Sequence, residues 1–255
     1  MTKVIITGSK GRMGSRIAAM IRDSKDLSVE AEIDAGDSLE RVVDKGDVVI
    51  DFTVASAAAK NAAIAALYRK PIVIGTTALS EDERRIVGEA AASVPVVFTP
   101  NMSVGVNVML KLVEVASQAM KSRCKIDIVE AHHVHKLDRP SGTAKKMLDI
   151  VLKETGLSLD EDVFFYEEET NDEPEGGDAE ISVRSIRRGE VVGDHAIHFA
   201  STGETLTITH HAATRDIFAE GAIAAARWII GRSPGLYGMD DVLELKAQAK
   251  KEDRA

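Results

Sequence analysis

Residues 130–144 contain the densest group of side chains in this sequence that could transfer protons or bind an anion. The segment reads Glu-Ala-His-His-Val-His-Lys-Leu-Asp-Arg-Pro-Ser-Gly-Thr-Ala and holds three of the seven histidines. Imidazole titrates near neutral pH, so His132, His133 and His135 are candidates for proton transfer. Because Pro-Ser-Gly-Thr predicts a turn that opens a helix, backbone N–H donors should lie beside these histidines. The segment therefore predicts an active site that handles protons together with a carboxylate or phosphate.

The residues that follow the histidines extend this chemistry. Lys136 can donate a proton or neutralise a carboxylate. Ser141, Gly142 and Thr143 offer N–H and hydroxyl donors at the expected start of the helix. Together they indicate recognition of an anionic small molecule.

Two other interpretations of the histidines are weaker. A zinc site needs three or four ligands, and on a strand only His133 and His135 would face the same side. Further histidines could complete a ligand set, but no H-E-x-x-H or C-x-x-C spacing accompanies them: His195, His198, His210 and His211. A solvated polar strand end is the second alternative, which the density of ionisable groups disfavours. We therefore expect no metal, and His135 and Asp138 are left without a firm role.

Short apolar runs alternate with helical patterns over the first hundred residues. The expected strands are 4–7, 27–33, 48–52, 72–75 and 96–98, and the expected helices are 12–23, 56–68 and 81–92. This alternation is typical of an α/β, Rossmann-like fold with a doubly wound parallel sheet. Ligands of such sheets bind at the carboxyl ends of the strands.

The pattern changes after residue 104. The sequence predicts helices at 105–121, 143–155 and 217–231, strands at 125–130, 181–186, 190–192, 195–200 and 204–211, and a long, exposed, acidic loop at 157–179. Turn signals between the last strands predict a mostly antiparallel meander, and hence a second, α+β domain. Sequence alone leaves open whether the last helix returns to the first domain. We assign it there, giving a dinucleotide-binding domain, 1–104 plus 216–255, and a substrate-binding and oligomerisation domain, 105–215, with a hinge near 100–105.

A glycine-rich loop follows the first expected strand. Its spacing is G-x-x-G-x-x-G from Gly8 to Gly14, and Lys10 replaces the second glycine of the standard G-x-G-x-x-G. Between a strand and a helix, such a loop lets the backbone and the helix N-terminus bind a pyrophosphate. Asp34 ends the second strand, where its carboxylate would accept hydrogen bonds from an adenosine ribose. The alternative is a glycine turn without a ligand.

The residues around Asp34 bear on the choice of cofactor. An acid at this position repels the 2′-phosphate of NADPH and favours NADH, and Ala35 offers that phosphate no positive partner. Lys10 and Arg12 supply some positive charge, so NADPH stays the alternative. Two further loops, 75–77 and 99–102, follow strands and are expected to flank the nicotinamide, although position alone also fits ordinary turns.

Composition limits the classes of protein to consider. Hydrophobic residues make up 44% and charged residues 29%, as in soluble globular proteins. No apolar run approaches the roughly 20 residues of a membrane span. The net charge of −9 argues against nucleic acid as the main partner. The single cysteine, Cys124, excludes an internal disulfide and is typical of a reducing compartment, and its neighbours indicate an ordinary thiol more than a nucleophile. We expect a cytoplasmic protein.

The pattern E-A-H-H-x-H-K-x-D-x-P-S-G-T-A closely resembles the signature of the 4-hydroxy-tetrahydrodipicolinate reductase family, also called dihydrodipicolinate reductase, of bacterial lysine and diaminopimelate synthesis. The resemblance runs nearly end to end, through motifs at 8–14, 51–53, 75–77, 101–107 and 243–245. It implies an oxidoreductase that reduces 4-hydroxy-tetrahydrodipicolinate (dihydrodipicolinate) to tetrahydrodipicolinate with NADH or NADPH. It also implies a homotetramer.

The resemblance further implies a role for each motif residue. His132 is the proton donor or acceptor, Lys136 is the proton donor, and the substrate's carboxylates are bound by His133, Gly142 and Thr143. The cofactor is bound at its pyrophosphate by Gly8, Ser9, Lys10, Gly11, Arg12 and Met13, at its adenosine ribose by Asp34, and on its nicotinamide side by Gly75, Thr76, Thr77, Thr99, Pro100, Asn101 and Met102. The sequence departs from the family at Ala35, where members that use NADPH often have Arg, and at Thr99-Pro100, where small residues are commoner.

Three alternative functions compete with this one. Within the oxidoreductases, another two-domain dehydrogenase, for a semialdehyde or a sugar, would be expected to lack the Ser-Gly-Thr turn beside paired histidines. A metal-dependent hydrolase with a vestigial nucleotide fold would use the histidines as ligands. A non-catalytic NADH sensor would not need the histidine and lysine set.

Overall fold

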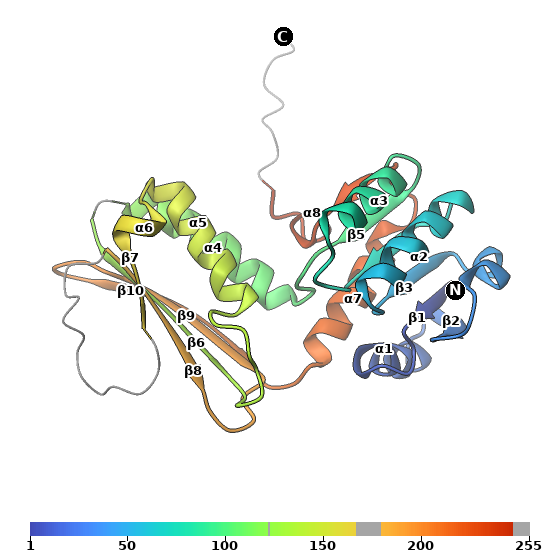
Figure 1. The fold of residues 1–255 in the computed structure, drawn as a ribbon, viewed down its shortest axis with the longest axis horizontal. Coiled ribbons are helices and arrows are strands. Elements are labelled where there is room, and N and C mark those ends of the chain that lie inside the picture. The colour runs from blue at the N-terminus through green and yellow to red at the C-terminus, as the bar shows by residue number, and fades with distance from the viewer. Residues whose placement is uncertain (122, 167–179, 247–255) are drawn as a thin grey trace, which may run out of the picture. The chain divides into compact units, whose positions relative to one another are not determined.

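The chain divides into two compact units in the computed structural model, which describes residues 1–121, 123–166 and 180–246 (Figure 1). The first unit comprises Met1–Val104 and Asp216–Ala255, and the second comprises Gly105–Arg215.

A six-stranded parallel sheet forms the centre of the first unit. Its strands, in chain order, are β1 (Thr2–Thr7), β2 (Leu27–Ile33), β3 (Val48–Asp51), β4 (Ile72–Ile74), β5 (Pro95–Phe98) and β11 (Gly235–Tyr237). They lie in the order β11-β5-β4-β3-β1-β2. The helices are α1 (Arg12–Arg22), α2 (Ala55–Leu67), α3 (Glu81–Ala91), α7 (Asp216–Ile229) and α8 (Met239–Val242), with short 3-10 turns η1 (Leu39–Arg41) and η2 (Val43–Lys45). The predicted Rossmann-like, doubly wound sheet is confirmed.

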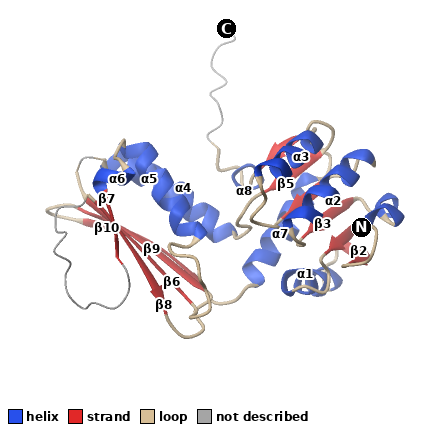
Figure 2. Cartoon of the chain, in the orientation of Figure 1, coloured by secondary structure: helices blue, strands red, loops and turns tan. Residues whose placement is uncertain are grey.

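Both faces of this sheet are buried, which explains why its strands read as continuous apolar runs. On β1, Val4 and Ile6 pack with α1 and α7 in one core cluster. Ile5, between them, points to the other face and packs with α2 and α3 in a second cluster. Figure 2 shows the strands enclosed by helices in this unit. Alternate residues of each strand therefore supply two separate cores.

Helix α7 belongs to the first unit although it follows the whole of the second in sequence. Arg16 on α1 donates from Nε and Nη2 to the two carboxylate oxygens of Asp216, each at 2.6 Å. Near its end, Trp228 contacts Tyr237 of β11, with ring centroids 5.1 Å apart. The sequence patterns predicted neither β11 nor α8, because these short elements lack the continuous apolar runs that mark β3, β4 and β5.

The second unit is a five-stranded sheet with helices on one face. Its strands are β6 (Lys125–His132), β7 (Val163–Tyr166), β8 (Ile181–Arg187), β9 (Gly193–Ala200) and β10 (Thr205–Ala212). Its helices are α4 (Val104–Met120), α5 (Gly142–Thr155) and α6 (Leu159–Asp162). Ile128, Ile197 and Phe199 from the sheet form one core cluster with Val113 of α4 and Met147 of α5. Figure 1 shows α4 and α5 lying over the same face.

The order of strands in this sheet corrects the expected, mostly antiparallel meander. The order is β10-β9-β6-β8-β7, so β6 lies between β8 and β9. β6 pairs antiparallel with β9 but parallel with β8, and β7 also pairs parallel with β8. The sheet is therefore mixed. Alternating polarity predicts that a segment is a strand, but it carries no information about which strand is its neighbour.

Two segments differ from their predicted conformation. Residues 190–192 do not form a strand, because Gly189 adopts φ +50° and Val191 donates its N–H to Arg188 O in a turn. Within the predicted loop 157–179, residues 159–162 form α6 and residues 163–166 form β7. The acidic residues 160–162 occupy the first turn of α6, where negative charge is stabilised by the positive end of the helix dipole. The rest of that loop, 167–179, lies outside the described residues.

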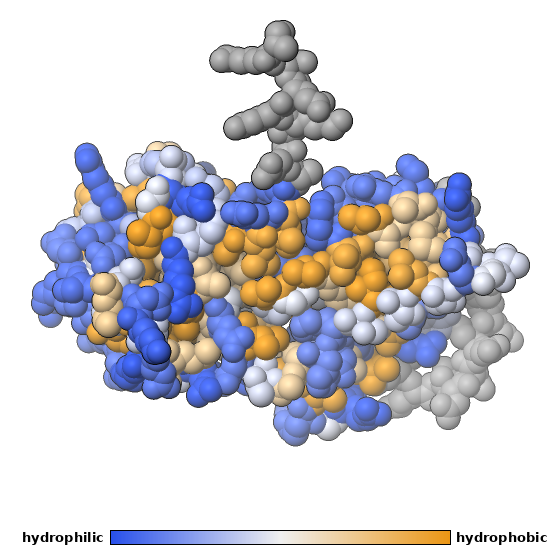
Figure 3. Space-filling model, turned by 180° about the vertical axis from the view of Figure 1, so that it is seen from behind, coloured by the Kyte–Doolittle hydropathy of each residue, from blue (hydrophilic) through white to orange (hydrophobic). Residues whose placement is uncertain are grey.

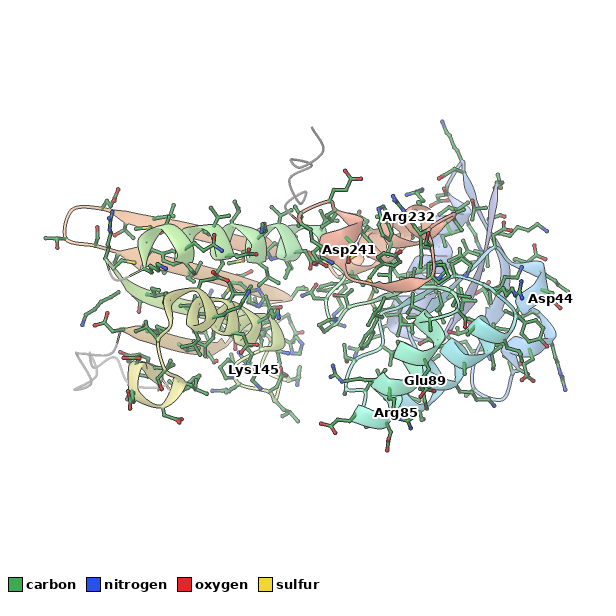
Figure 4. All side chains as sticks on the ribbon, turned by 90° about the horizontal axis from the view of Figure 1, so that it is seen from above. Asp44, Arg85, Glu89, Lys145, Arg232 and Asp241 are labelled. Carbon is green, nitrogen blue, oxygen red and sulfur yellow. The ribbon has the colours of Figure 1, made fainter. Side chains whose placement is uncertain are left out.

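The surface of both units mixes charged and apolar side chains. On the face shown in Figure 3, hydrophobic side chains reach the surface between hydrophilic ones. On α3, Arg85 donates to Glu89 at 2.7 Å, an exposed pair labelled in Figure 4. No helix among residues 1–121, 123–166 and 180–246 has the length and apolar character needed to cross a membrane.

A close approach between α7 and the backbone near β5 supplies a test of this packing. A Cβ at Gly221 would lie 1.7 Å from Met102 O, so the helix could not stay in place. We predict that Gly221→Ala lowers the free energy of unfolding by at least about 2 kcal/mol through overpacking. A Cβ at Gly88 of α3 would meet nothing within 4 Å. Gly88→Ala should therefore be neutral or stabilise by about 0.5–1 kcal/mol. Urea denaturation of both variants measures the difference, and equal midpoints would contradict the described contact.

Candidate active site

In the glycine loop between β1 and α1, the backbone leaves no room for a side chain at either end. Gly8 has φ +75°, and a Cβ there would lie 2.3 Å from Phe52 O. A Cβ at Gly14 would lie 2.1 Å from Gly8 O. Gly11 precedes α1 as its N-cap and supplies no side-chain cap, so the positive end of the helix dipole opens onto the loop. The loop fits an anionic group that approaches the backbone closely.

Asp34 lies against this loop, as the sequence predicts for its strand position. Its carboxylate accepts hydrogen bonds from the N–H of Ala35 at 2.8 Å and of Lys10 at 2.7 Å. These two bonds lower the pKa of Asp34. The carboxylate is therefore ionised at neutral pH beside the loop, and it can accept hydrogen bonds from a sugar hydroxyl.

A fully buried carboxylate organises the neighbouring strand ends. Asp51, at the end of β3, accepts hydrogen bonds from Thr7 Oγ1 at 2.6 Å, Asn61 Nδ2 at 2.7 Å and Thr76 Oγ1 at 2.7 Å. Thr53 donates to it from Oγ1 at 2.9 Å and from its N–H at 3.2 Å. These neutral donors tie together β1, β3, α2 and the loop after β4. Sequence reasoning missed this network, because its members are scattered along the chain.

The remaining residues predicted to bind a cofactor lie in two loops at the same sheet edge. The strand ends are in register, with Asp51 paired to Ile74 and Ile74 to Phe98. Gly75 follows β4, and a Cβ on it would lie 2.2 Å from the Phe52 ring. The other members are Thr76, Thr77, Thr99, Pro100, Asn101 and Met102, of which Thr76, Thr99 and Met102 are buried. Parallel pairing therefore brings every predicted cofactor residue to one edge of the first unit.

In the second unit, Glu130 and His132 end β6 as a hydrogen-bonded pair. His132 Nδ1 contacts Glu130 Oε2, and Arg187 Nη2 contacts Glu130 Oε1 at 2.8 Å. The N–H of Ser141 donates to the same Oε1 at 3.3 Å. Burial raises the pKa of Glu130, but hydrogen bonds from His132, Arg187 and Ser185 outweigh it and lower the pKa to about 2. Glu130 is therefore a buried, ionised acceptor for His132.

A second buried histidine lies beside this pair. The rings of His132 and His195 meet edge to face, with centroids 5.1 Å apart. His195 Nε2 lies 3.3 Å from Ser141 Oγ. Burial, with a smaller contribution from His132, lowers the pKa of His195 to about 4, so it is neutral at pH 7. Sequence reasoning considered His195 only as a metal ligand, and its position beside His132 is a finding of the structure.

Lys136 and the other two histidines of the segment lie in the loop after β6. Lys136 Nζ forms an ion pair with Asp138 Oδ1 at 2.8 Å. Burial raises the pKa of Asp138, but Lys136 outweighs this and the pKa is lowered. His133 has its pKa lowered by burial, and its ring lies 6.0 Å from that of His135. His135 is largely exposed, 3.8 Å from Glu190. Asp138 thus gains a partner that the spacing did not reveal.

The predicted Ser-Gly-Thr turn opens α5. Ser141 is the N-cap, and its Oγ accepts a hydrogen bond from the N–H of Ala144 at 3.2 Å. The backbone bond from Lys145 N–H to Ser141 O, 2.9 Å long, bridges the cap and the helix, and Figure 4 labels Lys145 on α5. Gly142 and Thr143 form the first turn of α5, at the positive end of its dipole. Since the N–H of Ser141 also donates to Glu130, the N-terminal end of α5 is joined to His132 through one carboxylate.

Within residues 1–121, 123–166 and 180–246, no group of three or more His, Cys, Asp or Glu residues is arranged to hold a metal ion.

A parallel sheet with a glycine loop and an acid after its second strand, in one chain with a unit that holds a carboxylate-bound histidine, defines a nicotinamide-dependent oxidoreductase. Family models agree in both halves. Residues 2–102 match the N-terminal model of dihydrodipicolinate reductase, and residues 105–243 match its C-terminal model. The chain belongs to the dihydrodipicolinate reductase family.

Named relatives support the same assignment. The 4-hydroxy-tetrahydrodipicolinate reductase of Akkermansia muciniphila is 42% identical over 246 residues, which cover 96% of this chain and 99% of the relative. That of Desulfotalea psychrophila is 41% identical, with 96% and 99% covered. A solved dihydrodipicolinate reductase from a Paenisporosarcina species, bound to dipicolinate, superposes with a TM-score of 0.76 at 21% identity, covering 94% of this chain and 99% of that one. This last similarity shows the fold.

Proposed function

We propose that the chain reduces 4-hydroxy-tetrahydrodipicolinate to tetrahydrodipicolinate, with NADH as its preferred electron donor and NADPH as the alternative. The observation that carries the proposal is the Glu130 carboxylate, which bonds both His132 and the N-cap of α5. A proton-exchanging group and an anion-binding helix end are thereby held together. This is the pair of functions that reduction of an anionic imine requires.

The first unit fits a nicotinamide dinucleotide. Residues 8–13 would hold the pyrophosphate, Asp34 the adenosine ribose, and the loops 75–77 and 99–102 would line the nicotinamide side. The tight backbone at Gly8 and Gly14 and the ionised carboxylate of Asp34 support this fit. When bound, the cofactor supplies the hydride.

The second unit supplies the groups that bind the substrate. His133 and the N–H groups of Gly142 and Thr143 would bind its carboxylates, because the start of α5 carries the positive end of the helix dipole. A carboxylate held there would set the orientation of the ring before reaction.

Proton transfer completes the reaction. Reduction adds hydride to a ring carbon and leaves negative charge on the conjugated nitrogen system, which then gains a proton. Lys136 would donate this proton and supply positive potential, and His132 would act as proton donor or acceptor. For the 4-hydroxy substrate, loss of water also needs an acid near the departing hydroxyl, a second use for the same groups.

We predict that His132→Gln and Lys136→Ala each lower kcat by about 10²-fold or more, the scale for a lost general acid. The assay supplies the product of a dihydrodipicolinate synthase and follows NADH oxidation by absorbance. Lys153→Ala removes an exposed lysine from the last turn of α5 and should change kcat by less than about twofold, as surface substitutions usually do. Near-normal turnover in both site variants would overturn the assigned roles.

Cofactor preference gives a second prediction. We expect kcat/KM to be higher with NADH than with NADPH, because Asp34 is ionised and Ala35 has no charge to offer a 2′-phosphate. Ala35 is exposed, so a long side chain is tolerated there. Ala35→Arg should raise kcat/KM for NADPH by about tenfold through charge-assisted hydrogen bonds, whereas the uncharged Ala35→Gln should not. Comparable efficiency with both cofactors in the parent protein would contradict the preference.

We further propose that the protein is a homotetramer of the cytoplasm. Support comes from apolar side chains left exposed on the second unit, including Leu112 and Val115 of α4, Phe165 of β7 and Leu206 of β10. Exposed apolar side chains and sheet edges of this kind are commonly covered by other subunits. Sedimentation velocity should show a species of four chains, and a monomer at micromolar concentration would refute the assembly.

A further inference from the structure

We propose that Glu130 and Arg187 are positioning residues that hold His132, the loop of Lys136 and the Ser141 turn in one arrangement, with His132 Nε2 as the proton-exchanging atom. The inference rests on the proposed function, because it assigns these residues a task in the same reaction. Neither residue was assigned a role by its sequence position.

Strand pairing places the two residues together. Glu130 and His132 are two positions apart on β6 and therefore share a face of the sheet. Arg187, at the end of the parallel neighbour β8, is the register partner of His132. The side chain of Glu130 is 0% exposed and that of Arg187 is 3% exposed, so the ion pair is withdrawn from water. A buried charge pair is costly unless its hydrogen bonds are satisfied, and here they are.

The two oxygens of Glu130 have different tasks. Oε2 contacts His132 Nδ1, whereas Oε1 receives Arg187 Nη2 and the N–H of Ser141. An ionised carboxylate can only accept hydrogen bonds, so His132 must carry its proton on Nδ1. Nε2 is then the atom that gains and loses a proton.

Arg187 also fixes the backbone of the loop that carries Lys136. Its Nε donates to Lys136 O at 3.2 Å, and its Nη2 donates to Asp138 O at 2.5 Å. The planar guanidinium therefore connects the loop to Glu130 in a fixed geometry that the flexible ammonium of a lysine would not provide.

Space is kept beside His132 Nε2. A Cβ at Gly193 would lie 3.1 Å from this nitrogen, so glycine leaves the approach uncrowded. Two ionisable side chains contact the His132 ring, Glu130 at Nδ1 and His195 edge to face, and His195 is neutral at pH 7. Glu130 is thus the group that orients the imidazole.

The test compares single and double variants in the coupled NADH assay. Glu130→Gln keeps the shape but removes the charge, and it should lower kcat by about 10–100-fold while substrate KM changes less than about threefold. If Glu130 acts through His132, the Glu130→Gln/His132→Gln double variant should be no slower than His132→Gln alone. Additive losses, or normal kcat in Glu130→Gln, would overturn the inference.

A readout independent of turnover is the imidazole ¹⁵N NMR spectrum of the whole protein. The His132 signal is assigned by its absence in His132→Gln. It should report Nδ1–H in the parent protein and a mixture of tautomers in Glu130→Gln. If His132→Gln itself retains full activity, the proposed function fails while the tautomer result still tests the positioning role. An unchanged His132 signal in Glu130→Gln would contradict the positioning role of Glu130 and would leave the proposed function unaffected.

Two further variants control for loss of folding and for non-specific effects of removing a carboxylate. Glu130→Gln removes the carboxylate charge that Arg187 pairs with inside the protein, so the chain could unfold. Glu130→Gln/Arg187→Met removes both charges and should fold, with a loss of kcat at least as large and the same tautomer mixture. Asp194→Asn is the matched control, since it removes the carboxylate partner of the exposed His211. It should change kcat by less than about twofold and leave the His132 signal in place.

Discussion

The arrangement at the end of β6 depends on the buried ion pair of Glu130 and Arg187. A carboxylate withdrawn from water is stable only when its oxygens are bonded, and Arg187, His132 and Ser141 supply those bonds. The same bonds fix an imidazole, a loop and a helix N-terminus relative to one another. The contacts that stabilise the buried carboxylate therefore also hold the groups that are proposed to react. Loss of either charge would remove the buried charged partner of the other.

The first unit also contains a buried carboxylate, but there it accepts hydrogen bonds from neutral groups. Asp51 is as deeply buried as Glu130, but its donors are threonine hydroxyls, a backbone N–H and the amide of Asn61. Neutral donors hold the strand ends and the loop after β4. In the second unit, where an anionic substrate is proposed to bind, the buried carboxylate is instead paired with a cation, Arg187. The two buried carboxylates therefore organise two edges with different electrostatic character.

Much of the fold could be predicted because periodicity reports burial. The strands of the first unit are buried on both faces and read as apolar runs such as Val4-Ile5-Ile6, while β9 alternates buried and half-buried residues. Pairing order could not be predicted, because β6 is inserted between β8 and β9 by contacts remote in sequence. The segment from 159 to 166 forms a short helix and a strand where the sequence predicts a loop, because acidic residues at 160–162 and in the segment after 166 dominate its composition.

The sequence by itself determined which chemical groups are present and how neighbouring ones are spaced. Gly8, Asp34, His132 and the Ser-Gly-Thr turn are local signals, because a loop, a strand end or a helix cap is specified within a few residues. Tertiary structure alone decided that Arg187 meets Glu130 and that His195 lies against His132. The reason is physical. Hydrogen-bond register between strands joins residues by position across a sheet, and burial then selects which of them must pair.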